Sequence, residues 1–106
     1  MSTSLGQLEK QIDTLKKQLM ALGPMRPGSI TRQYRQPKEK QRPFYQISYT
    51  HRMRSRSEYV RPDNLVALRR ETATFKRFKK LIERWVDLSL KASKLRVSQL
   101  DQPPRQ

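Results

Sequence analysis

The feature that most constrains the fold is a long series of apolar residues, spaced three and four positions apart, between Leu65 and Leu95. This spacing is typical of one face of an α-helix. Pro62-Asp63-Asn64 is a typical helix start, so we predict a helix over residues 63–97. At 1.5 Å per residue, about 30 residues extend about 45 Å, which is long for a globule made from 106 residues. The helix should therefore either break near Thr72–Thr74 or project and pair with another surface.

A second amphipathic helix is predicted over residues 4–22. Ser4 and Gln7 form a capping-box pattern at its start, and Gly23-Pro24 ends it. Its apolar residues recur at intervals of three and four, as in a coiled coil. This stripe either packs on the long helix of the same chain or pairs with a second copy or a larger protein partner. It consists of Leu5, Leu8, Ile12, Leu15, Leu19 and Leu22.

Strands are predicted between the two helices, where the sequence becomes rich in Arg, Gln, Tyr, Ser and Thr. The three strands are expected at residues 29–35, 44–50 and 54–61. In the second of them, Tyr45 and Ile47 alternate with polar residues, which is typical of a half-buried strand. The link between the last two strands is short enough for a hairpin but lacks the Gly or Asn that a tight turn prefers, so the turn type stays open.

These elements predict an α+β fold with an N-terminal helix, a three-stranded antiparallel β-sheet or hairpin, and a long C-terminal amphipathic helix. We expect a single small basic domain over residues 1–98 and a flexible tail over residues 99–106. Only 34% of the residues are hydrophobic, so the core should be modest and a deep catalytic pocket is not expected.

The charge of the chain indicates a polyanionic partner. Lys and Arg total 24 against 9 acids, a formal net charge of +15, and ten of these bases lie between residues 26 and 61 with only two acids. Eight of the ten are Arg, whose guanidinium group can hold two phosphate oxygens at once. The candidate nucleic-acid-binding residues are Arg32, Arg35, Lys38, Lys40, Arg42, Arg52, Arg54, Arg56, Arg61, Lys76, Arg77, Lys79 and Lys80.

Two further features allow alternative interpretations. Tyr49, His51 and Tyr59 lie near the hairpin arginines, where the aromatic rings either stack on bases or fill the core. The four candidate residues of the long helix, at positions 76–80, form either a stripe that follows a phosphate backbone or a solvated helix face.

The sequence offers little for catalysis. It has a single histidine and no cysteine, and its carboxylates are scattered, so it contains no catalytic triad, metal-ligand spacing or phosphate-binding Gly-rich loop. We therefore predict a protein that is not an enzyme and has no cofactor or metal. The absence of cysteine, of a signal peptide pattern and of a long apolar run favours a cytoplasmic location without a membrane partner.

Four segments resemble a family of small uncharacterised prokaryotic domains, which stand alone or lie at the start of transposase-related proteins. The segments are Arg26–Arg35, Pro43–Arg52, Tyr59–Arg61 and Phe75–Lys79. The resemblance extends over about residues 5–95 and implies a mobile-element or DNA-linked setting, but no activity. The chain departs from the family pattern in two places, because residues 36–42 lack a cysteine-containing insertion and Met53 replaces a turn glycine.

The leading hypothesis is a nucleic-acid-binding accessory protein, in which a helix pair backs a basic three-stranded sheet that contacts backbone phosphates. Whether the ligand is DNA or structured RNA, including a ribosome-associated role, stays open. The alternative is a helical protein-interaction adaptor or dimerisation module that uses the leucine-rich stripe.

Overall fold

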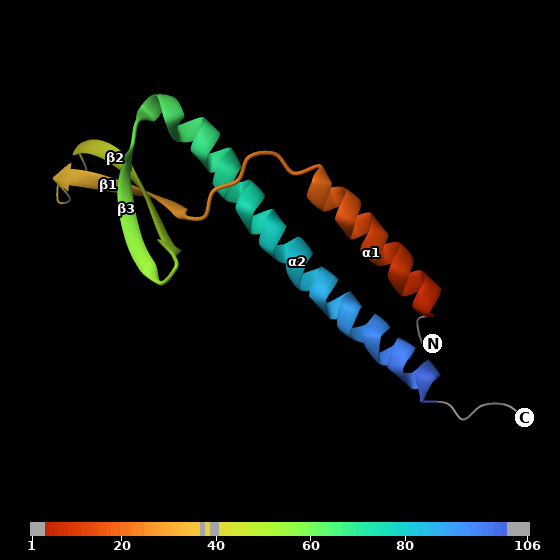
Figure 1. Cartoon of the computed structure of the whole chain (residues 1–106). Helices are drawn as coiled ribbons and strands as arrows, with labels where there is room; N and C mark the ends of the chain where they lie inside the picture. Colours follow the sequence, from red (N-terminus) through yellow and green to blue (C-terminus); the bar gives the residue numbers. More distant parts are fainter. Residues whose placement is uncertain (1–3, 37, 39–40, 102–106) are drawn as a thin grey trace, which may run out of the picture. The chain divides into compact units, whose positions relative to one another are not determined.

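A computed structural model describes residues 4–36, 38 and 41–101, with the side chains at 35–36 and 41–42 excepted. The predicted α+β fold is confirmed, because an N-terminal helix is followed by a three-stranded antiparallel sheet and a long C-terminal helix (Figure 1). The chain divides into two compact units. We call Met1–Leu22 with Phe78–Gln106 the helix unit, and Gly23–Arg77 the sheet unit. The single domain over residues 1–98 stays a prediction.

The helix unit is an antiparallel pair made by α1, Leu5–Met20, and the C-terminal part of α2, Leu65–Leu100 (Figure 1). The predicted capping box is present, since the Ser4 hydroxyl accepts from the Gln7 backbone N–H at 3.2 Å and the Gln7 side chain accepts from the Ser4 N–H at 3.1 Å. The apolar stripes of the two helices face each other. Their buried core is Leu8, Ile12, Leu15, Leu88 and Ala92, flanked by Leu5, Leu81, Trp85 and Leu95.

Helix α2 is continuous, so the alternative of a break near Thr72–Thr74 is wrong. The hydroxyl of Thr72 donates to the Arg69 carbonyl at 3.1 Å, and that of Thr74 donates to the Arg70 carbonyl at 2.8 Å. Both threonines thus satisfy their polar groups inside the helix. The short 3-10 helix η1, Pro62–Asn64, precedes α2, and α2 extends to Leu100. Residues 99 and 100 are therefore helical, whereas residues 102–106 of the predicted tail lie outside the described residues.

The sheet unit contains β1, Ser29–Gln36, β2, Gln41–His51, and β3, Arg54–Val60, in the order β1-β2-β3. Strand β2 begins three residues earlier than predicted. The residues before Phe44 are polar or proline and show no alternation, yet Pro43 lies opposite Tyr34 in the register with β1. Pairing with a neighbouring strand thus extended β2 beyond its apolar pattern.

The core of the sheet unit is small. Ile47 in the central strand is only 1% exposed, and Val60 and Thr72 are also buried. Gly28 lies against this core with a φ of +139°, a conformation that L side chains rarely adopt. A Cβ at this position would lie 2.9 Å from Ile47 Cγ1 and 3.1 Å from the Ser48 carbonyl oxygen. The backbone can approach β2 this closely because residue 28 has no side chain.

Candidate nucleic-acid interface

The strand register separates the charged residues from the uncharged ones. Residues directly opposite each other in an antiparallel sheet share a face, and Ile47 lies opposite both Ile30 and Glu58. We call the face that carries Ile47 the core face. Its described members are Ile30, Arg32, Tyr34, Pro43, Tyr45, Ile47, Tyr49, His51, Arg54, Arg56, Glu58 and Val60.

The opposite face, which we call the uncharged face, holds no charged residue among the described side chains of the three strands. Two hydroxyl pairs cross it between β2 and β3, Ser48 with Ser57 and Thr50 with Ser55, each at 2.9 Å. Its members are Ser29, Thr31, Gln33, Phe44, Gln46, Ser48, Thr50, Ser55, Ser57 and Tyr59. The period of two thus puts the described strand arginines Arg32, Arg54 and Arg56 on the side that also carries the core.

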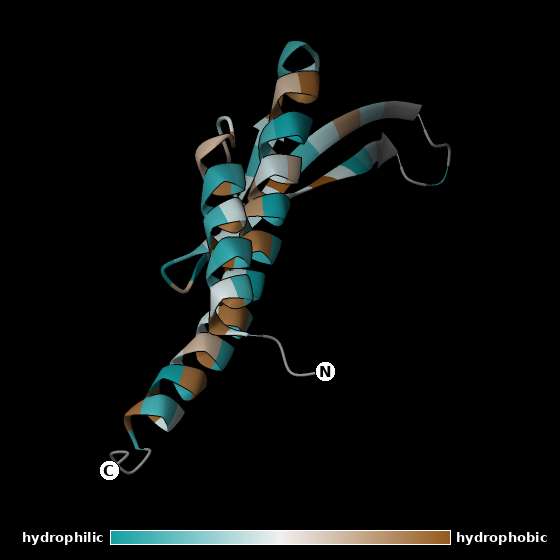
Figure 2. Cartoon of the chain, turned by 90° about the vertical axis from the view of Figure 1, so that its right-hand side faces the viewer, coloured by the Kyte–Doolittle hydropathy of each residue, from teal (hydrophilic) through white to brown (hydrophobic). Residues whose placement is uncertain are grey.

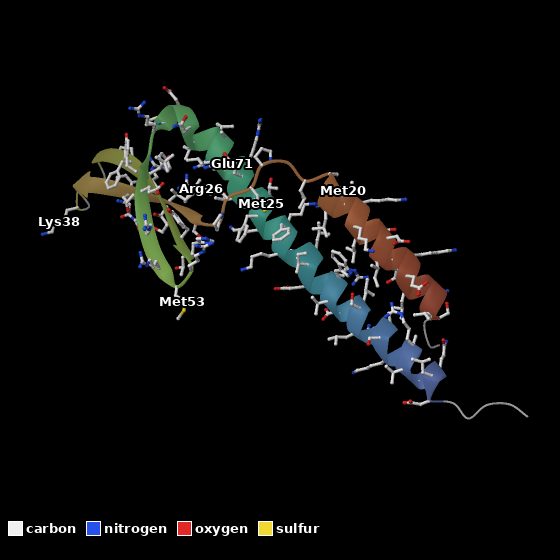
Figure 3. The ribbon with its side chains drawn as sticks, in the orientation of Figure 1. Met20, Met25, Arg26, Lys38, Met53 and Glu71 are labelled. Carbon is white, nitrogen blue, oxygen red and sulfur yellow. The ribbon has the colours of Figure 1, made fainter. Side chains whose placement is uncertain are left out.

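The β2–β3 hairpin ends in a tight turn. His51 pairs with Arg54, leaving Arg52 and Met53 as a two-residue loop. Their φ angles are 51° and 65°, as in a type I′ turn, in which both central residues have positive φ. Met53 is 98% exposed and points away from the sheet at the tip (Figure 3). The open question of turn type is thus answered by a turn that usually contains Asn or Gly but here contains two residues with long side chains.

An open recess with a volume of about 640 Å³ lies at this end of the hairpin. It is lined by Tyr49, His51, Arg52, Arg54 and Arg56, none of which is acidic. The two strand arginines reach it from the core face, and Arg52 reaches it from the turn. Three guanidinium groups around one recess can donate to several phosphate oxygens at once.

One wall of the recess is held in place by a network around Glu58. The Tyr49 hydroxyl donates to Glu58 Oε1 at 3.1 Å, and Arg26 pairs with the other carboxylate oxygen. The Arg26 guanidinium lies over the Tyr49 ring, 5.3 Å from its centroid. The Arg26 backbone N–H donates to the Glu71 carbonyl at 3.1 Å, which ties this segment to α2 (Figure 3). Tyr49 is therefore fixed through its hydroxyl and its ring.

The network shifts the protonation of Glu58. Hydrogen bonds from Arg26 and then Tyr49 hold the pKa of the Glu58 carboxyl below its ordinary value, and the Glu58 hydrogen bond raises the pKa of Arg26. Because the Glu58 pKa is lower in the folded than in the unfolded protein, this carboxylate stabilises the fold at neutral pH. That contribution is lost as the pH falls below the ordinary carboxyl range and through the folded-state pKa.

We expect Glu58→Gln to lower the stability of the protein at neutral pH and to flatten its loss of stability in acid. Chemical denaturation at a series of pH values, followed by tyrosine absorbance, measures both effects. Tyr49→Phe, which removes the second hydrogen bond, should flatten the same curve to a smaller degree. Glu9→Gln on the exposed side of α1 is the matched control. An unchanged pH profile for Glu58→Gln would contradict the role of the network.

The structure brings only part of the predicted site together. Arg52, Arg54 and Arg56 share the recess, whereas Arg32 lies over the Tyr34 ring at 5.3 Å on β1. Arg61 precedes η1, and Lys38 is exposed between β1 and β2. Lys40 lies outside the described residues, as do the side chains of Arg35 and Arg42. The helix candidates Lys76, Arg77, Lys79 and Lys80 are exposed on α2, the first two in the sheet unit and the others in the helix unit.

Some aromatic residues pack in the core, and others are exposed to solvent or line the recess. Tyr49 is half-buried and also lines the recess, while Tyr59 is exposed on the uncharged face. Tyr45 is half-buried beneath Arg69, whose guanidinium lies 5.6 Å from the ring centroid. Trp85 packs against the helix core with Lys16 over its ring at 5.5 Å, as expected for a core residue.

Sequence reasoning missed the role of Arg26 and Glu58. Arg26 counted only as one more base and Glu58 only as one of two acids in the segment. The alternation of charged and uncharged residues from Arg54 to Tyr59 was a usable signal, because it places Glu58 on the same face as Arg56. The pairing of Glu58 with Arg26, 32 residues earlier in the chain, had no signal in the sequence.

Among the described residues, no helix is long and apolar enough to cross a membrane. In the same part of the chain, no three His, Asp or Glu side chains gather as a metal site would require. Comparison with known proteins finds no matching curated protein and no matching solved structure. A family model described as a domain of unknown function (DUF6788) matches residues 5–70, a shorter stretch than the 5–95 of the expected resemblance. The match covers more than half of the chain, from α1 through the sheet to the first turns of α2, and the chain therefore belongs to this family.

Proposed function

We propose that this protein is a non-enzymatic, cytoplasmic nucleic-acid-binding accessory protein that contacts backbone phosphates through the end of its β2–β3 hairpin. The observation that carries the proposal is the recess lined by Arg52, Arg54 and Arg56 with no acidic residue. A polyanion relieves the mutual repulsion of these groups, and a net charge of +15 attracts it from a distance.

The neighbours of the arginines support contact with the backbone more than reading of bases. Tyr49 is tied to Glu58 and Arg26, so it offers a fixed surface beside the phosphate-binding groups. His51 adds a further donor at the rim. The described residues that line the recess include no Asn or Gln, the usual readers of adenine edges, so only the arginines could read a base there, at guanine. The expected ligand contact is therefore dominated by charge, with little dependence on base sequence.

The test is a titration of duplex DNA, single-stranded DNA and structured RNA at roughly 50 to 300 mM salt, using the parent protein and an Arg52→Ala, Arg54→Ala, Arg56→Ala triple variant. We expect binding whose logarithm falls linearly with the logarithm of salt concentration. The slope should become shallower by about 2 to 3 in the triple variant, because each lost phosphate contact removes about 0.9 from it on duplex DNA.

The matched control is Lys10→Ala, Lys16→Ala, Lys17→Ala, which removes the same number of charges from exposed positions on α1. This variant should change the slope far less than the hairpin variant, because counterions are released only at contacted phosphates. Weak binding of the parent to all three nucleic acids, or equal slopes for the parent and the hairpin variant, would refute the proposal.

The preference among the three nucleic acids also distinguishes a DNA-linked role from an RNA-bound role. Preference for duplex DNA supports the mobile-element or DNA-linked setting, which rests on the resemblance of the sequence to transposase-related domains. Preference for structured RNA supports a ribosome-associated or other RNA-bound role instead. Phosphate contact through the hairpin is common to both.

A further inference from the structure

The C-terminal part of α2 carries a second apolar stripe beside the one that packs on α1. Ile82 is half-buried, and the other members, at positions 86, 90, 97 and 100, are each more than half exposed. Intervals of four, four, seven and three keep these residues on one side of the helix. We define the second stripe as Ile82, Val86, Leu90, Val97 and Leu100.

This stripe differs from scattered surface hydrophobics. Its N-terminal half forms a shallow apolar depression of about 450 Å³, lined by Ile82, Trp85, Val86, Ser89 and Leu90. Apolar bands continue along α2 toward its C-terminal end (Figure 2). Such a strip, interrupted by Ser93 alone among its described positions, indicates an interaction surface on a helix of a strongly charged protein.

Charged residues beside the stripe suit a second copy of the chain as the partner. Lys80, Asp87, Lys94 and Asp101 follow one another along one edge of the stripe at intervals of seven, and their charges alternate in sign. In an antiparallel pair of identical helices related by a two-fold axis, this edge lies against the same edge of the other copy running the opposite way. A pair centred between residues 90 and 91 then sets Asp87 opposite Lys94 of the other copy, and Lys80 opposite Asp101.

A parallel pair lacks this complementarity. It would set the same edge against the opposite edge of the second stripe, where Trp85 and Ser89 carry no charge and Arg96 is the charged residue. We propose that the protein forms an antiparallel homodimer through the second stripe of α2, with Asp87 of each copy next to Lys94 of the other and Lys80 next to Asp101. The proposal does not depend on nucleic-acid binding, because every residue in it belongs to the helix unit.

The first test is the mass in solution over a range of micromolar concentrations, by sedimentation equilibrium. The parent should approach twice the 12.7 kDa of one chain as its concentration rises. Val86→Lys and Leu90→Lys should each remain a monomer throughout. Val66→Lys is the matched control, because it adds the same charge at an exposed valine on the same helix outside the stripe, and it should dimerise like the parent. A parent that stays monomeric at every concentration would overturn the proposal.

Charge exchange tests the pairing itself. Asp87→Lys, Asp101→Lys makes these four positions entirely basic, and Lys80→Glu, Lys94→Glu makes them entirely acidic, so each variant alone should be a monomer. A mixture of the two should form a heterodimer. A mixture that stays monomeric, or single variants that dimerise as well as the parent, would show that these charges do not face each other.

Disulfide crosslinking of single introduced cysteines distinguishes an antiparallel from a parallel helix pair, since the chain has no cysteine of its own. Ser89→Cys lies near the middle of the stripe and should form a disulfide-linked dimer under mild oxidation. Leu100→Cys lies at its end, where an antiparallel pair holds the two copies far apart, and should not. Efficient crosslinking through Leu100→Cys would establish a parallel pair and refute the antiparallel one.

Discussion

Gly28→Ala should lower the free energy of unfolding by about 3 kcal/mol, through backbone strain and a clash with the core, each worth about 1 to 3 kcal/mol. Its φ of +139° is available to glycine and costly for any other residue. The new Cβ would also meet Ile47, the most buried side chain of the sheet unit, at 2.9 Å. Because a protein of this size has a total stability on the order of 5 to 15 kcal/mol, this loss is large.

The measurement is denaturant unfolding followed by two signals. All four tyrosines lie in the sheet unit and the single tryptophan, Trp85, lies in the helix unit. Tyrosine absorbance should therefore report the Gly28→Ala defect directly. Gly23→Ala is the control, because a Cβ at Gly23 meets nothing within 4 Å. If the two alanine variants were equally stable, the close approach of Gly28 to Ile47 would be wrong.

Leu8→Ala should cost a similar amount, about 2 to 5 kcal/mol, in the helix unit. Leu8 belongs to the core between α1 and α2, and truncation there loses apolar burial and leaves a cavity. Few apolar residues are available to refill that space, since only five of the described residues of the helix unit form the buried cluster. The Trp85 fluorescence, which reports the same core, should follow the transition at lower denaturant concentration.

Met20→Ala on the same helix is the control for Leu8. Met20 is 87% exposed, so its truncation should change stability by no more than about 0.5 kcal/mol. An equal loss of stability in both variants would mean that general helix propensity, and not packing against α2, determines the stability of α1.

The helices were predictable because their apolar periodicity is also their packing pattern. The Leu5–Leu22 stripe faces the α2 stripe that includes Leu88 and Ala92, and Ser4 with Gln7 caps α1 as the sequence indicated. The sequence left a break near Thr72–Thr74 open as an alternative, because it does not show whether these hydroxyls find partners inside a helix, as they do through carbonyls of the preceding turn. The early start of β2 depends on its pairing with β1, which leaves no local pattern.

The sequence predicted which residues belong to the candidate site better than it predicted how they are arranged. Sequence reasoning selected Arg52, Arg54 and Arg56, and the turn gathers them around one recess. It did not foresee that Arg54 and Arg56 share a face with Ile47, because that depends on register. Long-range partners such as Arg26 and Glu58 are set by tertiary packing and cannot be read from spacing along the chain.

Arg52 and Met53 hold a backbone conformation that L-residues disfavour, so the backbone strain of the β2–β3 hairpin lies at its tip. The buried Val60 lies at the other end of β3. Opening of the hairpin from its tip would separate Arg52 in the turn from Arg54 and Arg56 of β3. A polyanion that contacts all three arginines, as proposed, would bind the closed hairpin in preference to the open one and raise the free energy of opening by that preference. Under the proposed function, the hairpin tip is therefore more rigid in the complex than in the free protein.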